Sequence, residues 1–155
     1  MIKRFFNEVA AAFSASGGGE TSAADREAAI RKATAVLMLD VARADYVFEE
    51  SEFERVLELV ERHFGLSPEE AIRLVNDAGD EAEDLTSVHQ FTELLHEHLH
   101  ETEKARIIAL LWQIAYADGR LDKYEDSLVL KISDLLYVSR PRVMRLKHDA
   151  ELAAR

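Results

Sequence analysis

The sequence predicts an all-α fold: a single helical domain built from two repeated three-helix units, preceded by a short N-terminal helix. Three observations support this fold class. Apolar residues recur at intervals of three and four along most of the 155 residues, which is the period of an amphipathic helix. No run with the alternation typical of a strand occurs. A segment near residue 42 returns 73 positions later, which indicates a duplicated structural unit.

The repeat consists of matched residues at equal spacing. The first copy contains Ala42-Arg43-Ala44-Asp45 with Glu52, and the second contains Ala115-Tyr116-Ala117-Asp118 with Glu125. After a slip of one residue, Ser67, Arg73-Leu74 and Asp77-Ala78 return as Ser139, Arg145-Leu146 and Asp149-Ala150. We therefore expect residues 36–78 and 109–150 to form the two units and to superpose about an approximate two-fold axis.

Residues 1–16 predict an amphipathic helix, because Ile2, Phe5, Phe6, Val9 and Phe13 lie on one stripe. Asn7 and Glu8 interrupt what would otherwise resemble a signal peptide. Three roles remain open for the stripe: packing on the domain, docking to a partner or second copy, and weak membrane contact through residues 1–13. Residues 17–23 predict a flexible linker, because consecutive glycines do not hold a helix.

The helical domain is then expected over residues 24–155, with boundaries set by caps. Ser22 or Asp25 caps a helix running to about residue 44, and the next helix starts near residue 50 and ends before Gly65. Ser67-Pro68 combines a cap with a proline in the first turn. Gly79 weakens the acidic stretch 78–85, which we expect to separate the two copies. Helices over 87–100, 102–117, 122–137 and from 139 onward complete the fold.

Composition limits the classes of function. The chain has no cysteine, which excludes disulfides, thiolate zinc sites and cysteine nucleophiles, and fits a cytoplasmic protein. Its net charge of -11 argues against nucleic acid and favours a cation or a basic protein as partner. No segment approaches the roughly 20 apolar residues that cross a bilayer.

The first helix of each copy ends in an aspartate, where the helix dipole disfavours an acid. Two explanations are open. Asp45 and Asp118 accept hydrogen bonds from backbone N–H groups of the turn, or each joins neighbouring acids around a hard divalent cation such as calcium or magnesium. The candidate metal ligands are Asp118, Asp122 and Glu125, with Asp45 and Glu52 as their first-copy counterparts. The second copy is the better candidate, because Gly119 suits a left-handed turn where the first copy has Tyr46.

The segment from Leu110 to Glu125, with its Ala117-Asp118-Gly119 motif and a glutamate six residues after that glycine, resembles the tellurite-resistance TerB-like family. The resemblance extends over about residues 26–152 and is closer to the small stand-alone members. A related domain precedes the J-domain of a membrane-anchored co-chaperone. The resemblance implies an all-helical domain in a bacterial stress response, with Asp118 and Glu125 among acids proposed to bind divalent cations.

His96-Glu97-His98-Leu99-His100 matches the HExxH pattern of zinc metalloproteases. On a helical wheel, however, His96 and His100 lie opposite the face formed by Leu95, Leu99 and their apolar neighbours. We therefore expect both histidines in solvent, where replacement changes stability by less than about 0.5 kcal/mol.

Three functional hypotheses follow. The first is a non-enzymatic TerB-like domain that binds a protein partner or a second copy and takes a divalent cation at the acidic turns. The second is a metal-dependent hydrolase that uses the helix with His96 and His100. The third is a purely structural or oligomerisation module. No catalytic residue and no organic cofactor is predicted.

Overall fold

The computed structural model describes residues 20–43, 50–84, 88–116 and 121–154. These ranges contain seven helices and no strand, so the prediction of an all-α fold is confirmed. The helices are α2 (Glu20–Ala42), α3 (Glu50–Phe64), α4 (Pro68–Asp84), α5 (Val88–His98), α6 (Glu101–Ala115), α7 (Lys123–Leu135) and α8 (Arg140–Ala153). The predicted helix over residues 1–16 lies outside the described residues. The predicted linker 17–23 is too long, because α2 begins at Glu20 and only the glycines are unsuited to a helix.

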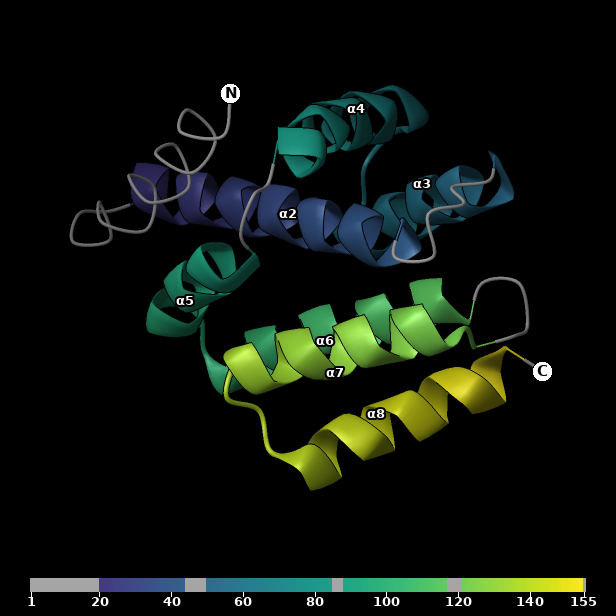
Figure 1. Cartoon of the computed structure of the whole chain (residues 1–155). Helices are drawn as coiled ribbons and strands as arrows, with labels where there is room; N and C mark the ends of the chain where they lie inside the picture. The colour runs from purple at the N-terminus through teal and green to yellow at the C-terminus, as the bar shows by residue number, and fades with distance from the viewer. Residues whose placement is uncertain (1–19, 44–49, 85–87, 117–120, 155) are drawn as a thin grey trace.

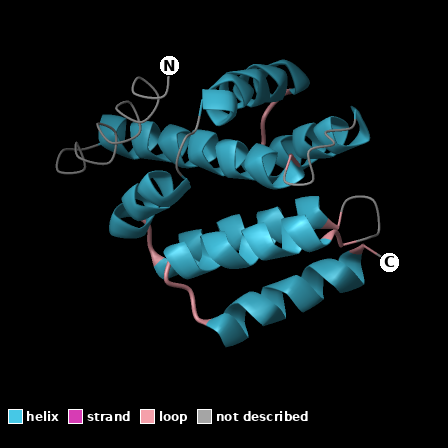
Figure 2. Cartoon of the chain, viewed as in Figure 1, coloured by secondary structure: helices cyan, strands magenta, loops and turns pink. Residues whose placement is uncertain are grey.

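The helices stack in layers (Figure 1). α2 and α3 form one central layer, and α6 and α7 form the next. α4 covers the outer side of the first layer by packing on α2 and α3, and α8 covers the opposite side by packing on α6 and α7. The layers meet where α2 contacts α6 and α7, and short described loops join α3 to α4, α5 to α6 and α7 to α8 (Figure 2). Within the described part of the chain, no helix has the length and apolar character of a membrane span.

Residues matched by the repeat occupy similar environments in the two halves. Leu37 and Leu110 are both buried, as are Val56 and Val129. Further matched pairs are Ala78 with Ala150, both buried, and Leu74 with Leu146, both packed at the edge of the core. The order of contacts is also shared, since α2 packs on α3 and α4 as α6 packs on α7 and α8. The superposition of residues 36–78 on 109–150 stays a prediction.

One element is longer than predicted. α4 continues through Gly79 to Asp84, where a separating segment is expected from residue 78. Its inner side packs on α2 through Ala71, Val75 and Ala78, each at most 1% exposed. This burial compensates for the roughly 1 kcal/mol that a mid-helix glycine costs relative to alanine.

The second helix of each unit ends in the same way but with different residues. The Leu66 N–H donates to the Glu61 carbonyl at 3.2 Å, and the Val138 N–H donates to the Ser133 carbonyl at 3.2 Å. In both turns the residue between helix and loop is left-handed, Gly65 at φ 62° and Tyr137 at φ 60°. Glycine adopts this conformation without steric cost, whereas a tyrosine is strained there. The side chain of Tyr137 is 71% exposed, so burial of this side chain does not compensate for the strain.

We expect alanine at the two described helix-associated glycines to have opposite effects. Gly65→Ala should lower the free energy of unfolding by about 1 kcal/mol, because a Cβ disfavours the left-handed region. Gly79→Ala should raise it by about 0.5–1 kcal/mol, because alanine is the better helix former and its Cβ would lie 3.8 Å from Leu39 Cδ1, an ordinary contact. Urea unfolding of both variants measures the difference. Destabilisation by Gly79→Ala would show that the α2–α4 contact has no room for a methyl group.

Candidate functional site

The acidic residues of the second copy lie at the start of α7. Asp122 is the N-cap of this helix, and its Oδ2 accepts hydrogen bonds from the Tyr124 N–H at 2.9 Å and the Glu125 N–H at 3.3 Å. Both bonds use one oxygen, so Oδ1 makes no hydrogen bond within the described ranges. Glu125 lies in the same first turn and is only 6% exposed. The sequence thus places two carboxylates three residues apart at the start of one helix.

In the same first turn, Asp126 pairs with a lysine from α8. Lys147 Nζ lies 2.8 Å from Asp126 Oδ1, which makes an ion pair although the angles are not those of a hydrogen bond. The side chains are 21% and 28% exposed, so water screens the pair only in part. The same ammonium lies 5.3 Å from the centre of the Trp112 ring, within the range of a cation–π contact. Asp126 is therefore engaged by a cation of the chain itself.

Two aromatic residues, Trp112 of α6 and Tyr116 at its C-cap, lie near Lys147. Trp112 is fully buried, and its indole N–H has no hydrogen-bond partner in the described part of the chain. Tyr116 follows one turn later and is 8% exposed. Burial raises the pKa of the Tyr116 hydroxyl, Glu151 and Asp126 raise it further, and Lys147 opposes them. Tyr116 therefore stays protonated at neutral pH and can donate a hydrogen bond.

The first copy has fewer described acids that could form a cation site. Glu52 lies in the first turn of α3 and is partly buried, while Asp45, its predicted co-ligand, lies outside the described residues. Nearby, burial raises the pKa of Asp40, and Arg43 and Lys131 oppose that shift. No described acid of this turn occupies an N-cap comparable with that of Asp122.

The candidate ligand set is incomplete in the described structure. Asp118 and Gly119 fall within residues 117–120, outside the described residues. Among the residues that are described, no three histidine, aspartate or glutamate side chains group in a way that could hold a metal ion. Asp122 and Glu125 provide hard oxygen donors of the kind that calcium and magnesium prefer. A cation at this turn would therefore require Asp118 or backbone carbonyls as well.

The HExxH pattern does not form a single helical face. α5 ends at His98, and His100 is the N-cap of α6, with its N–H donating to Glu103 Oε1 at 2.8 Å. His96 and His100 are thus on different elements, whereas the metalloprotease arrangement needs both histidines one turn apart on one helix. The sequence pattern fails here because the chain turns inside the motif.

The expectation that His96 lies in solvent is wrong. Its Nδ1 is 2.6 Å from Nζ of Lys104, and its ring centre is 4.3 Å from that of Tyr137. Lys104 is only 5% exposed. A helical wheel of α5 misses these contacts, because the lysine comes from α6 and the tyrosine from the end of α7. His100 is exposed, as expected.

Sequence reasoning missed Lys104 and Lys147, although a signal was present. Each lysine occupies a position of an otherwise apolar stripe, Lys104 with Ile108 and Leu111, and Lys147 with Val143 and Ala150. A cation at such a position enters the protein interior and therefore needs a partner there. The partners are His96 for the first lysine and Asp126 for the second.

Comparison with known proteins gives one kind of match. A family model described as "Tellurite resistance protein TerB" matches residues 31–148. Neither a search of curated proteins nor a search of solved structures yields a match.

Proposed function

The chain belongs to the TerB family of tellurite resistance proteins, because the family model spans well over half of its length, and from this premise we propose a non-enzymatic interaction domain. In this proposal the domain binds a protein partner in a bacterial stress response. It also takes up a divalent cation at the turn between α6 and α7. The cation ligands are Asp118, Asp122 and Glu125.

One observation carries the cation proposal: a carboxylate at the N-cap of α7, Asp122, and a second one in the first turn, Glu125. Asp122 keeps Oδ1 available while Oδ2 caps the helix, and Glu125 is held in a buried position three residues later. In the sequence, Asp118 lies between α6 and this helix. The carboxyl end of α6 adds favourable partial negative charge for a cation.

The neighbouring residues explain why the proposed ligand set excludes Asp126. Its carboxylate faces Lys147, whose ammonium would repel a divalent ion. The set is therefore three carboxylates, which leaves further positions for water or backbone oxygens, as hard cations require.

No observation favours the hydrolase hypothesis, because His96 and His100 lie on separate elements. The first-copy acids Asp45 and Glu52 are a weaker candidate than the second-copy acids, because Tyr46 replaces the turn glycine. We assign them a structural role in the turn between α2 and α3.

Titration with calcium chloride or magnesium chloride tests the proposal. At ten times the dissociation constant, the ion should stabilise the wild-type protein by about 1.4 kcal/mol, which corresponds to a rise in Tm of roughly 3–6 °C. Asp118→Asn should abolish this rise, because the amide retains a hydrogen-bond acceptor but not the charge. Asp122→Asn should also abolish it while leaving the ion-free Tm nearly unchanged, since asparagine is an equally good N-cap.

Asp45→Asn is the matched control and should retain the full ion-dependent rise. An ion-induced shift that survives in Asp118→Asn would refute the proposed site. If Asp118→Asn and Asp45→Asn reduced the ion-dependent rise in Tm equally, the ion would not bind at the second copy alone.

A further inference from the structure

The outermost helices of the two units expose an apolar residue at the same repeat position. Ile72 on α4 is 46% exposed, and Met144 on α8 is 41% exposed. Each precedes an exposed arginine, Arg73 or Arg145, and the inner side of each helix packs on the first helix of its own unit. The chain therefore presents two outer faces of similar shape, which we call the α4 face and the α8 face.

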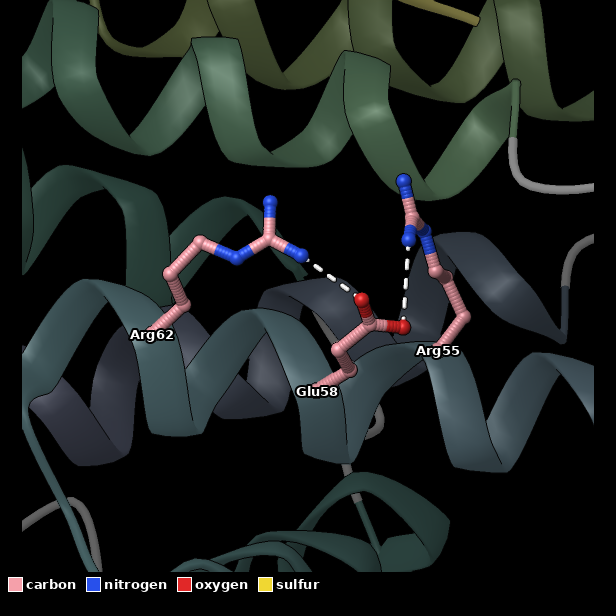
Figure 3. A network of polar contacts seen from close by, with 3 residues as sticks. All are labelled: Arg55, Glu58 and Arg62. Atoms are coloured by element: carbon pink, nitrogen blue, oxygen red, sulfur yellow. Dashed lines mark hydrogen bonds and ion pairs between the residues drawn. The ribbon is translucent and has the colours of Figure 1, made fainter.

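The two helices that carry these faces differ sharply in net charge. α4 carries seven acids and one base, a net charge of -6, whereas α8 carries four bases and two acids, a net charge of +2. α8 has the only net positive charge among the described helices. Within the α3–α4 pair, Arg55 and Arg62 both bind Glu58, at 3.1 and 2.6 Å (Figure 3). Two of the three bases of α3 and α4 are thus paired with an acid of α3.

The bases of α8 differ in whether they form ion pairs within the chain. Arg140 contacts Asp134 at 2.9 Å and Arg142 lies 3.8 Å from Glu101, while Lys147 points inward to Asp126. Arg145 and His148 are exposed beside Met144. On the α4 face, the exposed residues near Ile72 in the sequence include Glu69 and Asp77. Exposed Arg73 on α4 and Asp149 on α8 add a charge of the other sign to each face, but acids predominate on α4. An apolar contact with Arg145 facing the acids of α4 is thus available between the two faces.

We propose that the α8 face of one copy docks on the α4 face of a second copy. This inference rests on the proposed role as an interaction domain and names the partner as the same chain. Met144 and Ile72 supply the apolar centre, and Arg145 lies against the acids of α4. A like pairing of two α4 faces would bring together two helices of net charge -6, which repel each other.

The position of the faces determines the type of assembly. α4 and α8 lie on opposite sides of the molecule, so one copy cannot form both contacts with the same neighbour (Figure 1). The contact is therefore head-to-tail, and each added copy leaves one α4 face and one α8 face available. Because opposite charges contribute, association should weaken as salt rises.

Sedimentation velocity at low salt tests the interface. The wild-type protein should show a mass that increases with concentration beyond that of a dimer and returns to monomer at high salt. Ile72→Asp and Met144→Asp should each be monomeric when alone. An equal mixture of the two should form a two-chain complex and nothing larger, because only one intact pair of faces remains.

Far-UV circular dichroism serves as the control for folding. Both variants should keep the wild-type spectrum, because the substituted positions are exposed. Ser127→Asp, which adds the same charge at an exposed site of α7, should associate like the wild type. The inference would be overturned by any of three results. These are a wild-type protein that stays monomeric, self-association of the Ile72→Asp variant in the absence of Met144→Asp, and a mixture of the two variants that stays monomeric. The ion titration reports on single chains, so these outcomes leave the cation proposal to its own test.

Discussion

Replacing Trp112 with alanine should lower the free energy of unfolding by about 3–5 kcal/mol, because it removes a fully buried indole from the centre of the C-terminal unit. The cavity would open between α6 and α8, where Lys147 lies over the ring. The ammonium would lose its cation–π contact at the same time. Because Trp112 is the sole tryptophan, unfolding in urea is followed by far-UV circular dichroism rather than by fluorescence.

Trp112→Phe separates packing from polarity at the same position. The indole N–H is buried without a partner in the described residues, and such a donor costs about 1–3 kcal/mol. Phenylalanine removes this cost while keeping an aromatic ring under Lys147, so we expect a net loss below about 1.5 kcal/mol. A loss close to that of Trp112→Ala would show that the N–H makes a favourable hydrogen bond in solution.

Local signals in the sequence predicted the helix boundaries well. Ser67-Pro68 starts α4 as expected, with the Ser67 hydroxyl accepting from the Glu70 N–H at 3.2 Å and the Glu70 carboxylate accepting from the Ser67 N–H at 3.0 Å. The bond from the Ser67 N–H is the main cause that lowers the pKa of the Glu70 carboxyl, and the Ser67 side chain lowers it further. Gly65 ends α3 as predicted. Caps are local, because donor and acceptor lie within one turn of each other.

The failures occurred where a distant element decides. Because of Gly79, residues 78–85 are expected to be a weak segment between the two copies, but the contact of α4 with α2 overrides the low propensity of the glycine. The left-handed end of α7 was not predicted, because Tyr137 stands where the first copy has Gly65. Its aromatic contact with His96 joins the ends of α5 and α7, and no periodicity within one helix reports such a contact.

The candidate site follows the same division. The cap formed by Asp122 is local and matches its predicted helix start. The pairing of Asp126 with Lys147 depends on how α8 packs on the unit, so no local pattern in the sequence indicates it. Asp118 stays a prediction, because its turn lies outside the described residues.

The contact between His96 and Lys104 gives the second large expected effect. His96→Ala should destabilise the protein by about 2–3 kcal/mol, because it removes the acceptor of a nearly buried ammonium and the ring that contacts Tyr137. His100→Ala, two residues beyond the end of α5, should cost less than about 0.5 kcal/mol, since its side chain is exposed. Urea unfolding at neutral pH compares the two.

Lys104→Met tests whether the loss arises from the buried charge. Methionine fills a similar volume without an ammonium group, so adding it to His96→Ala should recover part of the lost stability. The two substitutions should therefore be non-additive, with a coupling of about 0.5–3 kcal/mol in a double-mutant cycle. Additive effects, or equal small losses for His96→Ala and His100→Ala, would place His96 in solvent and contradict the contact. Recovery would show that α5 and α6 are joined through a lysine that requires this histidine as its acceptor.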